Sequence, residues 1–195
     1  HQATEDIAFM TTLPQMKVLV PADTAAASAA FDIALATPGP VFTRLMRDPL
    51  YELYGTGEQF ELGGSKVVRE GKDITIATYG DIVFQSLQAG DELAKQGIDA
   101  EVIDFYSIKP WDQAVLEKSL QKTGALVVAE NHQKRNGFGY EAAVWSLLNH
   151  PVPTTLIGLE DTFAESGNYF KTLDKFGLSG AAIASKAAEL VARKK

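Results

Sequence analysis

Short β-rich apolar runs alternate with longer helical windows along most of this chain, and this alternation constrains the fold more than any other feature. Such an order is typical of βα units arranged around a mainly parallel sheet. The sequence therefore predicts an α/β fold. The runs expected to form strands are Val18–Val20, Val41–Leu45, Lys66–Arg69, Ile74–Thr78, Glu101–Phe105, Ala125–Ala129 and Thr154–Gly158.

Helical windows lie between and after these runs, with recognisable start and stop signals. Asp23 is expected to cap a helix that continues to Ala36, and Asp81 to cap one that Gly97 ends. The other predicted helices are Glu5–Leu13, Trp111–Lys122, one with Ala143, Val144, Leu147 and Leu148 on a single face, and Gly180–Arg193.

A change in composition divides the chain into parts. Residues 51–65 are rich in glycine and aromatic side chains without helical periodicity, which predicts an interdomain linker. Residues 66–195 contain enough strands and helices for a complete, doubly wound C-terminal domain. Residues 1–50 hold only about one and a half βα units, so we expect a partial α/β domain whose open sheet edge pairs with something else.

Composition excludes several classes of partner. Hydrophobic residues make up 46% and charged residues 22% of the 195 residues, as in an ordinary globular protein. A net charge of −7 disfavours nucleic acid and anionic membranes as partners. The absence of cysteine fits a reducing cytoplasm. Because the chain begins with His1, we expect an incomplete polypeptide.

The general catalytic signatures are absent from the sequence. It contains no Gly-x-Gly-x-x-Gly, Walker loop, His-Glu-x-x-His or Gly-x-Ser-x-Gly, and it predicts no metal site. The run from Asn136 to Gly139 follows a strand and opens a helix, so Gly137 and Gly139 could present backbone N–H groups to an anion. Close packing of these glycines on the sheet explains them equally well.

Two polar residues follow the strand Ala125–Ala129, at the end where open α/β sheets bind their ligands. Glu130 and His132 could therefore belong to a ligand site. A hydrogen-bonded pair that fixes the loop is the favoured alternative, because some strand ends must carry polar residues in any case.

Several ordered motifs resemble the transketolase family. The match begins with His1–Ala8, Leu13-Pro14 and Val18–Asp23, which are similar to the late part of the pyrimidine-binding domain. It continues through the strand and arginine loop Pro40–Pro49. The motifs similar to the family's C-terminal domain are Arg69–Asp73, Ile108–Pro110, Ala129–His132, Gly137–Gly139, Ile157-Gly158 and Asp161–Gly167. 1-Deoxyxylulose-5-phosphate synthase and the β subunits of 2-oxoacid dehydrogenases share the architecture but fit the Phe163–Gly167 run less well.

The resemblance implies transfer of a two-carbon ketol unit between sugar phosphates, with thiamine diphosphate as the electron sink. By motif position, His1 corresponds to the family histidine at the reacting end of the donor sugar. Arg47 corresponds to the arginine that binds the substrate phosphate, for which a guanidinium is well suited. Gln2 and Glu5 belong to the His1 motif and are expected to shape the substrate site.

Other parts of the family's machinery are missing from the sequence. The Gly-Asp-Gly magnesium motif does not occur, and the glutamate that activates the cofactor would precede His1. We therefore expect thiamine diphosphate and Mg²⁺ in the full enzyme but no tight cofactor binding by this chain. The expected partners are an N-terminal transketolase section or subunit and a sugar phosphate, in a homodimer. The isolated chain should be inactive; a non-catalytic dimerisation or regulatory module is the alternative.

Overall fold

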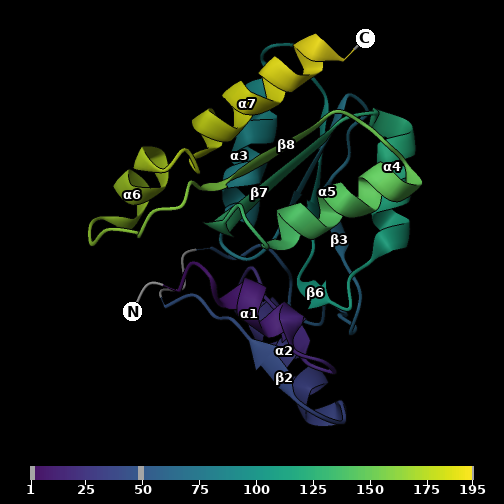
Figure 1. Ribbon diagram of the computed structural model, residues 1–195, viewed down its shortest axis with the longest axis vertical. Coiled ribbons are helices and arrows are strands. Elements are labelled where there is room, and N and C mark those ends of the chain that lie inside the picture. The colour runs from purple at the N-terminus through teal and green to yellow at the C-terminus, as the bar shows by residue number, and fades with distance from the viewer. Residues whose placement is uncertain (1–2, 48–50, 195) are drawn as a thin grey trace.

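The structure is a computed structural model that describes residues 3–47 and 51–194 (Figure 1). It contains a smaller and a larger sheet with helices packed around them. The strands are β1 (Lys17–Leu19), β2 (Val41–Thr43), β3 (Lys66–Arg69), β4 (Ile74–Thr78), β5 (Ala100–Asp104), β6 (Ser107–Lys109), β7 (Leu126–Gln133) and β8 (Thr154–Leu159). The helices are α1 (Asp6–Thr12), α2 (Thr24–Ala36), α3 (Ile82–Ala94), α4 (Gln113–Thr123), α5 (Phe138–Asn149), α6 (Tyr169–Lys175) and α7 (Gly180–Arg193).

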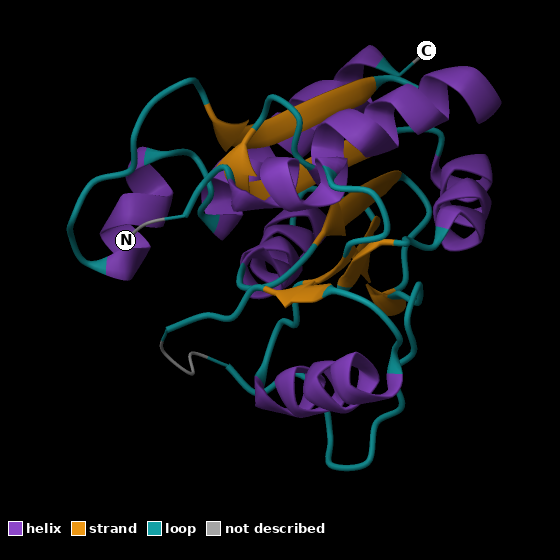
Figure 2. Cartoon of the chain, turned by 60° about the horizontal axis from the view of Figure 1, so that its bottom comes forward, coloured by secondary structure: helices purple, strands orange, loops and turns teal. Residues whose placement is uncertain are grey.

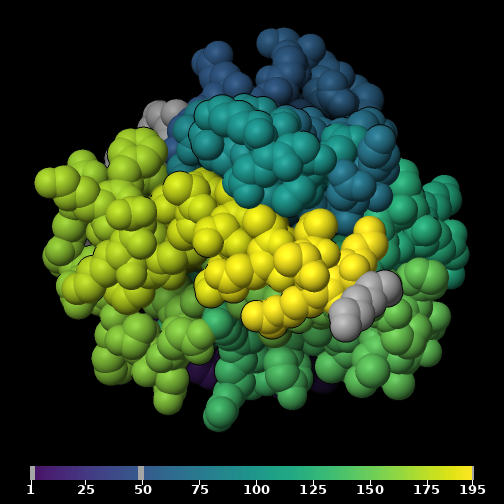
Figure 3. Space-filling view, turned by 90° about the horizontal axis from the view of Figure 1, so that it is seen from above, coloured from purple at the N-terminus to yellow at the C-terminus, as the bar shows by residue number. Residues whose placement is uncertain are grey.

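The larger sheet has the strand order β3-β5-β4-β7-β8 and is parallel except for β3. Helices cover both of its faces (Figures 1 and 2). α3 and α7 pack together on one face, where α7 lies across the surface beside α3 (Figure 3). α4 and α5 pack on the other face, together with Ile7 of α1. The predicted α/β class with a mainly parallel sheet is therefore confirmed.

The apolar runs form strands because both faces of the sheet are covered. Every residue of β4 and of β5 is buried, and this includes the polar residues Thr75, Thr78, Glu101 and Asp104. Two of the helix ends also have the capping residues typical of a helix start and a helix end. The Asp23 carboxylate accepts a hydrogen bond from the Ala26 amide (2.8 Å) at the start of α2. α4 ends at Gly124 in the left-handed conformation, with φ 65°.

Three features differ from the sequence-based expectation. The short elements β6 and α6 were not predicted. Asp81 does not cap α3 with its side chain. The face of α5 predicted to be buried is largely exposed, because the helix buries Phe138, Ala142 and Ser146 whereas Leu147 and Leu148 are 69% and 76% exposed.

The smaller sheet, with the order β2-β1-β6, joins the N-terminal part of the chain to the segment after β5. β1 and β2 are parallel and come from the N-terminal part, whereas β6 follows β5 and pairs antiparallel with β1. Both edges of β1 are therefore paired from within the chain, by β2 on one side and by β6 on the other. No helix among the described residues is long and apolar enough to cross a bilayer.

Candidate functional site

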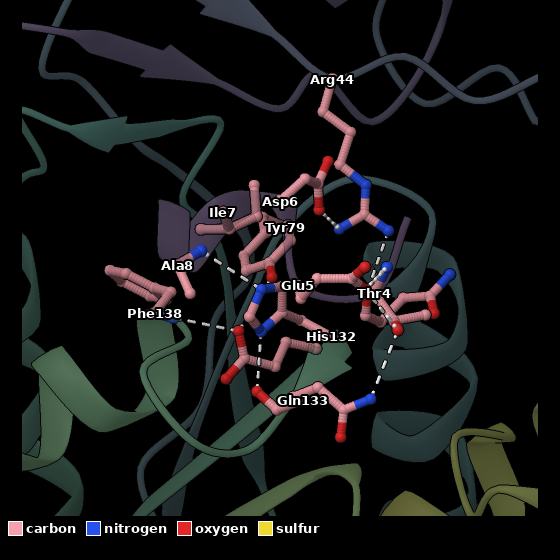
Figure 4. Close-up of polar contacts among 12 residues, drawn as sticks. Thr4, Glu5, Asp6, Ile7, Ala8, Arg44, Tyr79, His132, Gln133 and Phe138 are labelled. Atoms are coloured by element: carbon pink, nitrogen blue, oxygen red, sulfur yellow. Dashed lines mark hydrogen bonds and ion pairs between the residues drawn. The ribbon is translucent and has the colours of Figure 1, made fainter. Parts of the chain in front are cut away.

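The candidate site lies where β4 and β7 diverge. The next strand after β4 in the sequence, β5, lies on one side of β4 in the sheet, and the later strand β7 lies on its other side. This reversal of strand order is the switch point at which open α/β sheets bind ligands. The end of β4 at Thr78 pairs with Ala129, but β7 continues to Gln133. The last residues of β7 therefore extend past β4, and they meet the N-terminal segment of the same chain (Figure 4).

Glu130 is buried in this extension and binds the start of α5. Its carboxylate accepts hydrogen bonds from the amides of Phe138 and Gly139 (both 3.0 Å) and from the Tyr79 hydroxyl (2.8 Å). A Cβ on Gly137 would lie 2.5 Å from this carboxylate, so the close approach requires glycine there. The helix N-terminus singled out by Gly137 and Gly139 thus binds a carboxyl group that the chain itself supplies.

Burial in this position raises the pKa of Glu130 to about 7. Desolvation is the main cause, and it outweighs the three donors, which favour the charged form.

His132 lies two residues further along β7 and binds a different helix. Its Nε2 accepts a hydrogen bond from the amide of Ala8 in α1 (3.3 Å), and its Nδ1 is 2.7 Å from the carbonyl of Gln133. These partners assign the proton to Nδ1 and leave Nε2 as the acceptor. The ring is fully buried, and this burial lowers the pKa of His132.

Asn131 and Gln133, the residues next to Glu130 and His132 in β7, hydrogen-bond to other parts of the N-terminal segment. The Asn131 carbonyl accepts a hydrogen bond from Arg44 Nη2 (2.8 Å), while Arg44 Nη1 lies 3.6 Å from Asp6 of α1. The backbone amide of Gln133 donates to the Thr4 carbonyl (2.7 Å). Consecutive residues at the end of β7 therefore anchor the segment that follows His1.

The residues predicted to bind substrate are divided between two cavities. Arg47 is exposed at a cavity of about 180 Å³ that is also lined by Asp23, Tyr51 and Asp81. Glu5 lines a second cavity of about 380 Å³ together with His132. His1 and Gln2 lie outside the described residues.

The hydrogen bonds of the Glu5 carboxylate are local and involve the preceding residue, Thr4. Its carboxylate accepts hydrogen bonds from the amide (2.9 Å) and the hydroxyl (3.0 Å) of Thr4, and these bonds lower the pKa of Glu5. In the part of the chain that the structure describes, no group of three or more His, Asp or Glu residues could hold a metal ion.

Sequence reasoning did not assign the polar residues that follow β4 to the site, and it treated Asp81 only as a helix cap. Tyr79 binds Glu130, and Asp81 accepts hydrogen bonds from Asn131 (3.1 Å) and from the Tyr169 hydroxyl (2.7 Å). A signal was available, because Tyr79 and Asp81 follow the carboxyl end of a predicted strand, as Glu130 does.

Asp104, at the end of β5, is a further buried carboxyl that sequence reasoning missed. One of its oxygens accepts a hydrogen bond from the Tyr54 hydroxyl (2.6 Å), and the other has no partner among the described residues. Desolvation raises the pKa of Asp104 to about 7. Tyr54 belongs to the predicted linker, so this contact ties that segment to the larger sheet.

The raised pKa of Asp104 predicts a pH dependence of stability. Between an unfolded-state pKa of about 3.9 and the folded value, the folded chain binds more protons, so its stability falls as pH rises through this window. Asp104→Asn keeps an acceptor for Tyr54 without a charge. From pH 4 to pH 8 its free energy of unfolding should therefore gain roughly 2–4 kcal/mol relative to wild type. Urea unfolding at both pH values measures this, and parallel wild-type and variant curves would contradict it.

Comparison with known proteins defines the class to which this fold and site belong. The model of the transketolase C-terminal domain matches residues 63–183, and that of the transketolase pyrimidine-binding domain matches residues 1–51. The chain belongs to the transketolase family.

Relatives that are themselves named as transketolase subunits resemble the whole chain. The 6-deoxy-6-sulfo-D-fructose transketolase subunit SqwH of Clostridium sp. (strain MSTE9) is 41% identical over 100% of this chain and 60% of its own length. An apulose-4-phosphate transketolase subunit of Phocaeicola vulgatus is 32% identical over 98% of this chain and 61% of its own length.

A solved structure agrees with these sequence matches. A split-gene transketolase, described as an inactive β4 tetramer, superposes with a TM-score of 0.94 at 36% identity, covering 100% of this chain and 63% of that one. The chain thus spans about 60% of the length of these two subunits and of this split-gene transketolase.

Proposed function

We propose that this chain is the C-terminal part of a thiamine-diphosphate-dependent transketolase that transfers a two-carbon ketol unit between sugar phosphates. The observation that carries the proposal is the docking of the segment after His1 on the end of β7. That contact fixes Thr4 and α1, the described residues that follow the motif histidine in the sequence. The subunit names of the relatives support a partner that supplies the remaining machinery.

The residues described in this chain do not fit a magnesium diphosphate site, because they offer no cluster of carboxylates or histidines for the metal. We therefore assign binding of Mg²⁺ and the diphosphate to an N-terminal section or subunit. Thiamine diphosphate supplies the electron sink for cleavage of the carbon–carbon bond. In the proposal, this chain contributes His1 at the reacting end of the sugar and Arg47 at its anionic end, in a homodimeric assembly.

Reconstitution tests the function directly. This chain, mixed with the upstream transketolase section, thiamine diphosphate and Mg²⁺, should transfer ketol units from a ketose phosphate to an aldose phosphate. Either component alone should be inactive, and titration of this chain alone should show no saturable thiamine diphosphate binding below millimolar concentration. An assembled but inactive complex would instead favour a dimerisation or regulatory module.

A sulfonated ketose is a second candidate donor. The relative with 41% identity is named for 6-deoxy-6-sulfo-D-fructose, and a sulfonate presents tetrahedral anionic oxygens as a phosphate does. A guanidinium at the position of Arg47 could pair with either group. The ratio of kcat/KM for the phosphorylated and the sulfonated donor, measured in the same complex, decides between them.

Replacing Arg47 with alanine should raise KM for the phosphorylated donor about 10- to 100-fold, because a charge-assisted hydrogen bond contributes roughly 1.5–3 kcal/mol. The value of kcat should change little, since the phosphate is remote from the bond that breaks. Arg193→Ala, at the end of α7, is the matched control. Equal KM values for wild type and Arg47→Ala would remove Arg47 from the substrate site.

A further inference from the structure

Helix α1, which follows the His1 motif, begins without a cap of its own. It has only seven residues, a length at which an isolated helix is marginal. The first N–H groups of a helix need partners from outside it. Glu5 occupies the N-cap position, but its carboxylate binds Thr4 and makes no capping hydrogen bond. The start of α1 therefore depends on another part of the chain.

His132 supplies the missing cap. Ala8 is the third residue of α1, and its amide is one that a capping side chain ordinarily satisfies. The acceptor here is Nε2 of His132, 124 positions further along the chain. The hydrogen bond between Nδ1 and the Gln133 carbonyl fixes the orientation of the ring (Figure 4). Full burial of the ring leaves it little freedom to move.

A second set of contacts holds the chain immediately before α1. The Gln133 amide donates to the carbonyl of Thr4, and Gln133 Nε2 lies 3.3 Å from the Thr4 hydroxyl. The same Nε2 also donates to the Thr162 carbonyl (2.8 Å), which ties Gln133 to the loop after β8. His132 and Gln133 thus hold the chain on both sides of Glu5, close in sequence to the His1-Gln2 pair.

We propose that His132 is a positioning residue for ketol transfer: by capping α1 at Ala8, it sets the orientation of the segment that carries His1. This inference rests on the proposed function. It gives the C-terminal domain a specific part in the reaction, because β7 of that domain places a group belonging to the pyrimidine-binding part. Glu130 plays the corresponding role for α5, so one strand caps two helices that lack side-chain caps of their own.

A matched pair of variants isolates the capping contact. In His132→Gln the side-chain oxygen reaches the position of Nε2 and can still accept from Ala8. In His132→Asn the amide replaces only Nδ1, so the acceptor is lost. His150→Asn, in the turn after α5, is the control for replacing a histidine elsewhere.

Amide hydrogen exchange measures the cap without requiring activity. The amides of Ile7, Ala8 and Phe9 should exchange roughly 5- to 10-fold faster in His132→Asn than in wild type, as expected for loss of a helix cap. They should exchange at nearly the wild-type rate in His132→Gln and His150→Asn. Unchanged exchange in His132→Asn, or equally fast exchange in His132→Gln, overturns the capping role. If His132→Asn does not fold, the result for His132→Gln decides.

Kinetics of the reconstituted complex test the positioning role. His132→Asn should lower kcat about tenfold and leave KM for the donor within twofold, because Arg47 lies at the other cavity; His132→Gln should restore kcat. If His132 had only a structural role, His132→Asn would lower the amount of folded complex, but the folded complex would keep the wild-type kcat. If the wild-type complex is active and His132→Asn has the same kcat and KM, only the positioning role is overturned. An inactive wild-type complex overturns the proposed function and this inference with it, whatever the exchange rates.

Discussion

Replacing His1 with alanine should reduce kcat/KM for ketol transfer in the reconstituted complex by about 10²- to 10⁴-fold, the range for removal of a group that handles protons in the transition state. A histidine suits this task because its unperturbed pKa of about 6.5 lets it gain and lose a proton near neutral pH. The effect should fall mainly on kcat, since the substrate's anionic group is assigned to Arg47.

The contacts that anchor the N-terminal segment should separate an effect of His1→Ala on activity from an effect on folding. The segment after His1 is anchored by Thr4 and Ala8, whose contacts to Gln133 and His132 do not involve His1. Thermal stability and assembly with the upstream section should therefore be unchanged in His1→Ala. His150→Ala serves as the control and should retain full activity. Wild-type kinetics in His1→Ala would remove this residue from the active site while leaving the family assignment intact.

Replacing Glu130 with alanine should lower the free energy of unfolding by about 3–5 kcal/mol, because buried donors that lose their acceptor cost roughly 1–3 kcal/mol each. The donors are the amides of Phe138 and Gly139 and the hydroxyl of Tyr79. These groups join α5 and β4 to β7, so the loss should be cooperative and not confined to one loop. Urea unfolding of the chain measures it.

Glu130→Gln provides the matched comparison. The side chain keeps its size, but only one of its two terminal atoms can accept, so the loss should be about 1–2 kcal/mol. Glu160→Ala removes an exposed carboxylate paired with Lys134 and should cost less than about 1 kcal/mol. A Glu130→Ala variant as stable as Glu160→Ala would show that water replaces the carboxylate without loss, and the capping role of Glu130 would fall.

The central architecture could be read from the sequence because it depends on local pattern. The β-rich runs of β4, β5 and β7 predict the strands of a parallel sheet, and Asp23 predicts the start of α2 from its own side-chain chemistry. Signals of this kind involve residues a few positions apart. The resemblance to the transketolase family was equally visible, because it rests on ordered motifs and not on contacts.

Other features could not be read in this way. β6 is a three-residue strand without a distinctive pattern, and it exists because β1 offers an unpaired edge. The apolar face of α5 suggests a core contact, yet Leu147 and Leu148 lie on the exposed side while Ala142 and Ser146 are buried. Which side of an amphipathic helix is buried depends on the neighbours that the fold provides.

The sequence alone therefore determined the α/β class, most strands, the family and the residues to examine, including Glu130, His132 and Arg47. Only the tertiary structure decided what Glu130 and His132 do. Glu130 accepts hydrogen bonds at the start of α5, and His132 accepts one from Ala8 in α1 across 124 positions. The reason is physical: helix ends and buried carboxyl groups must find partners, but nothing in the local sequence states which distant segment the fold will bring to them.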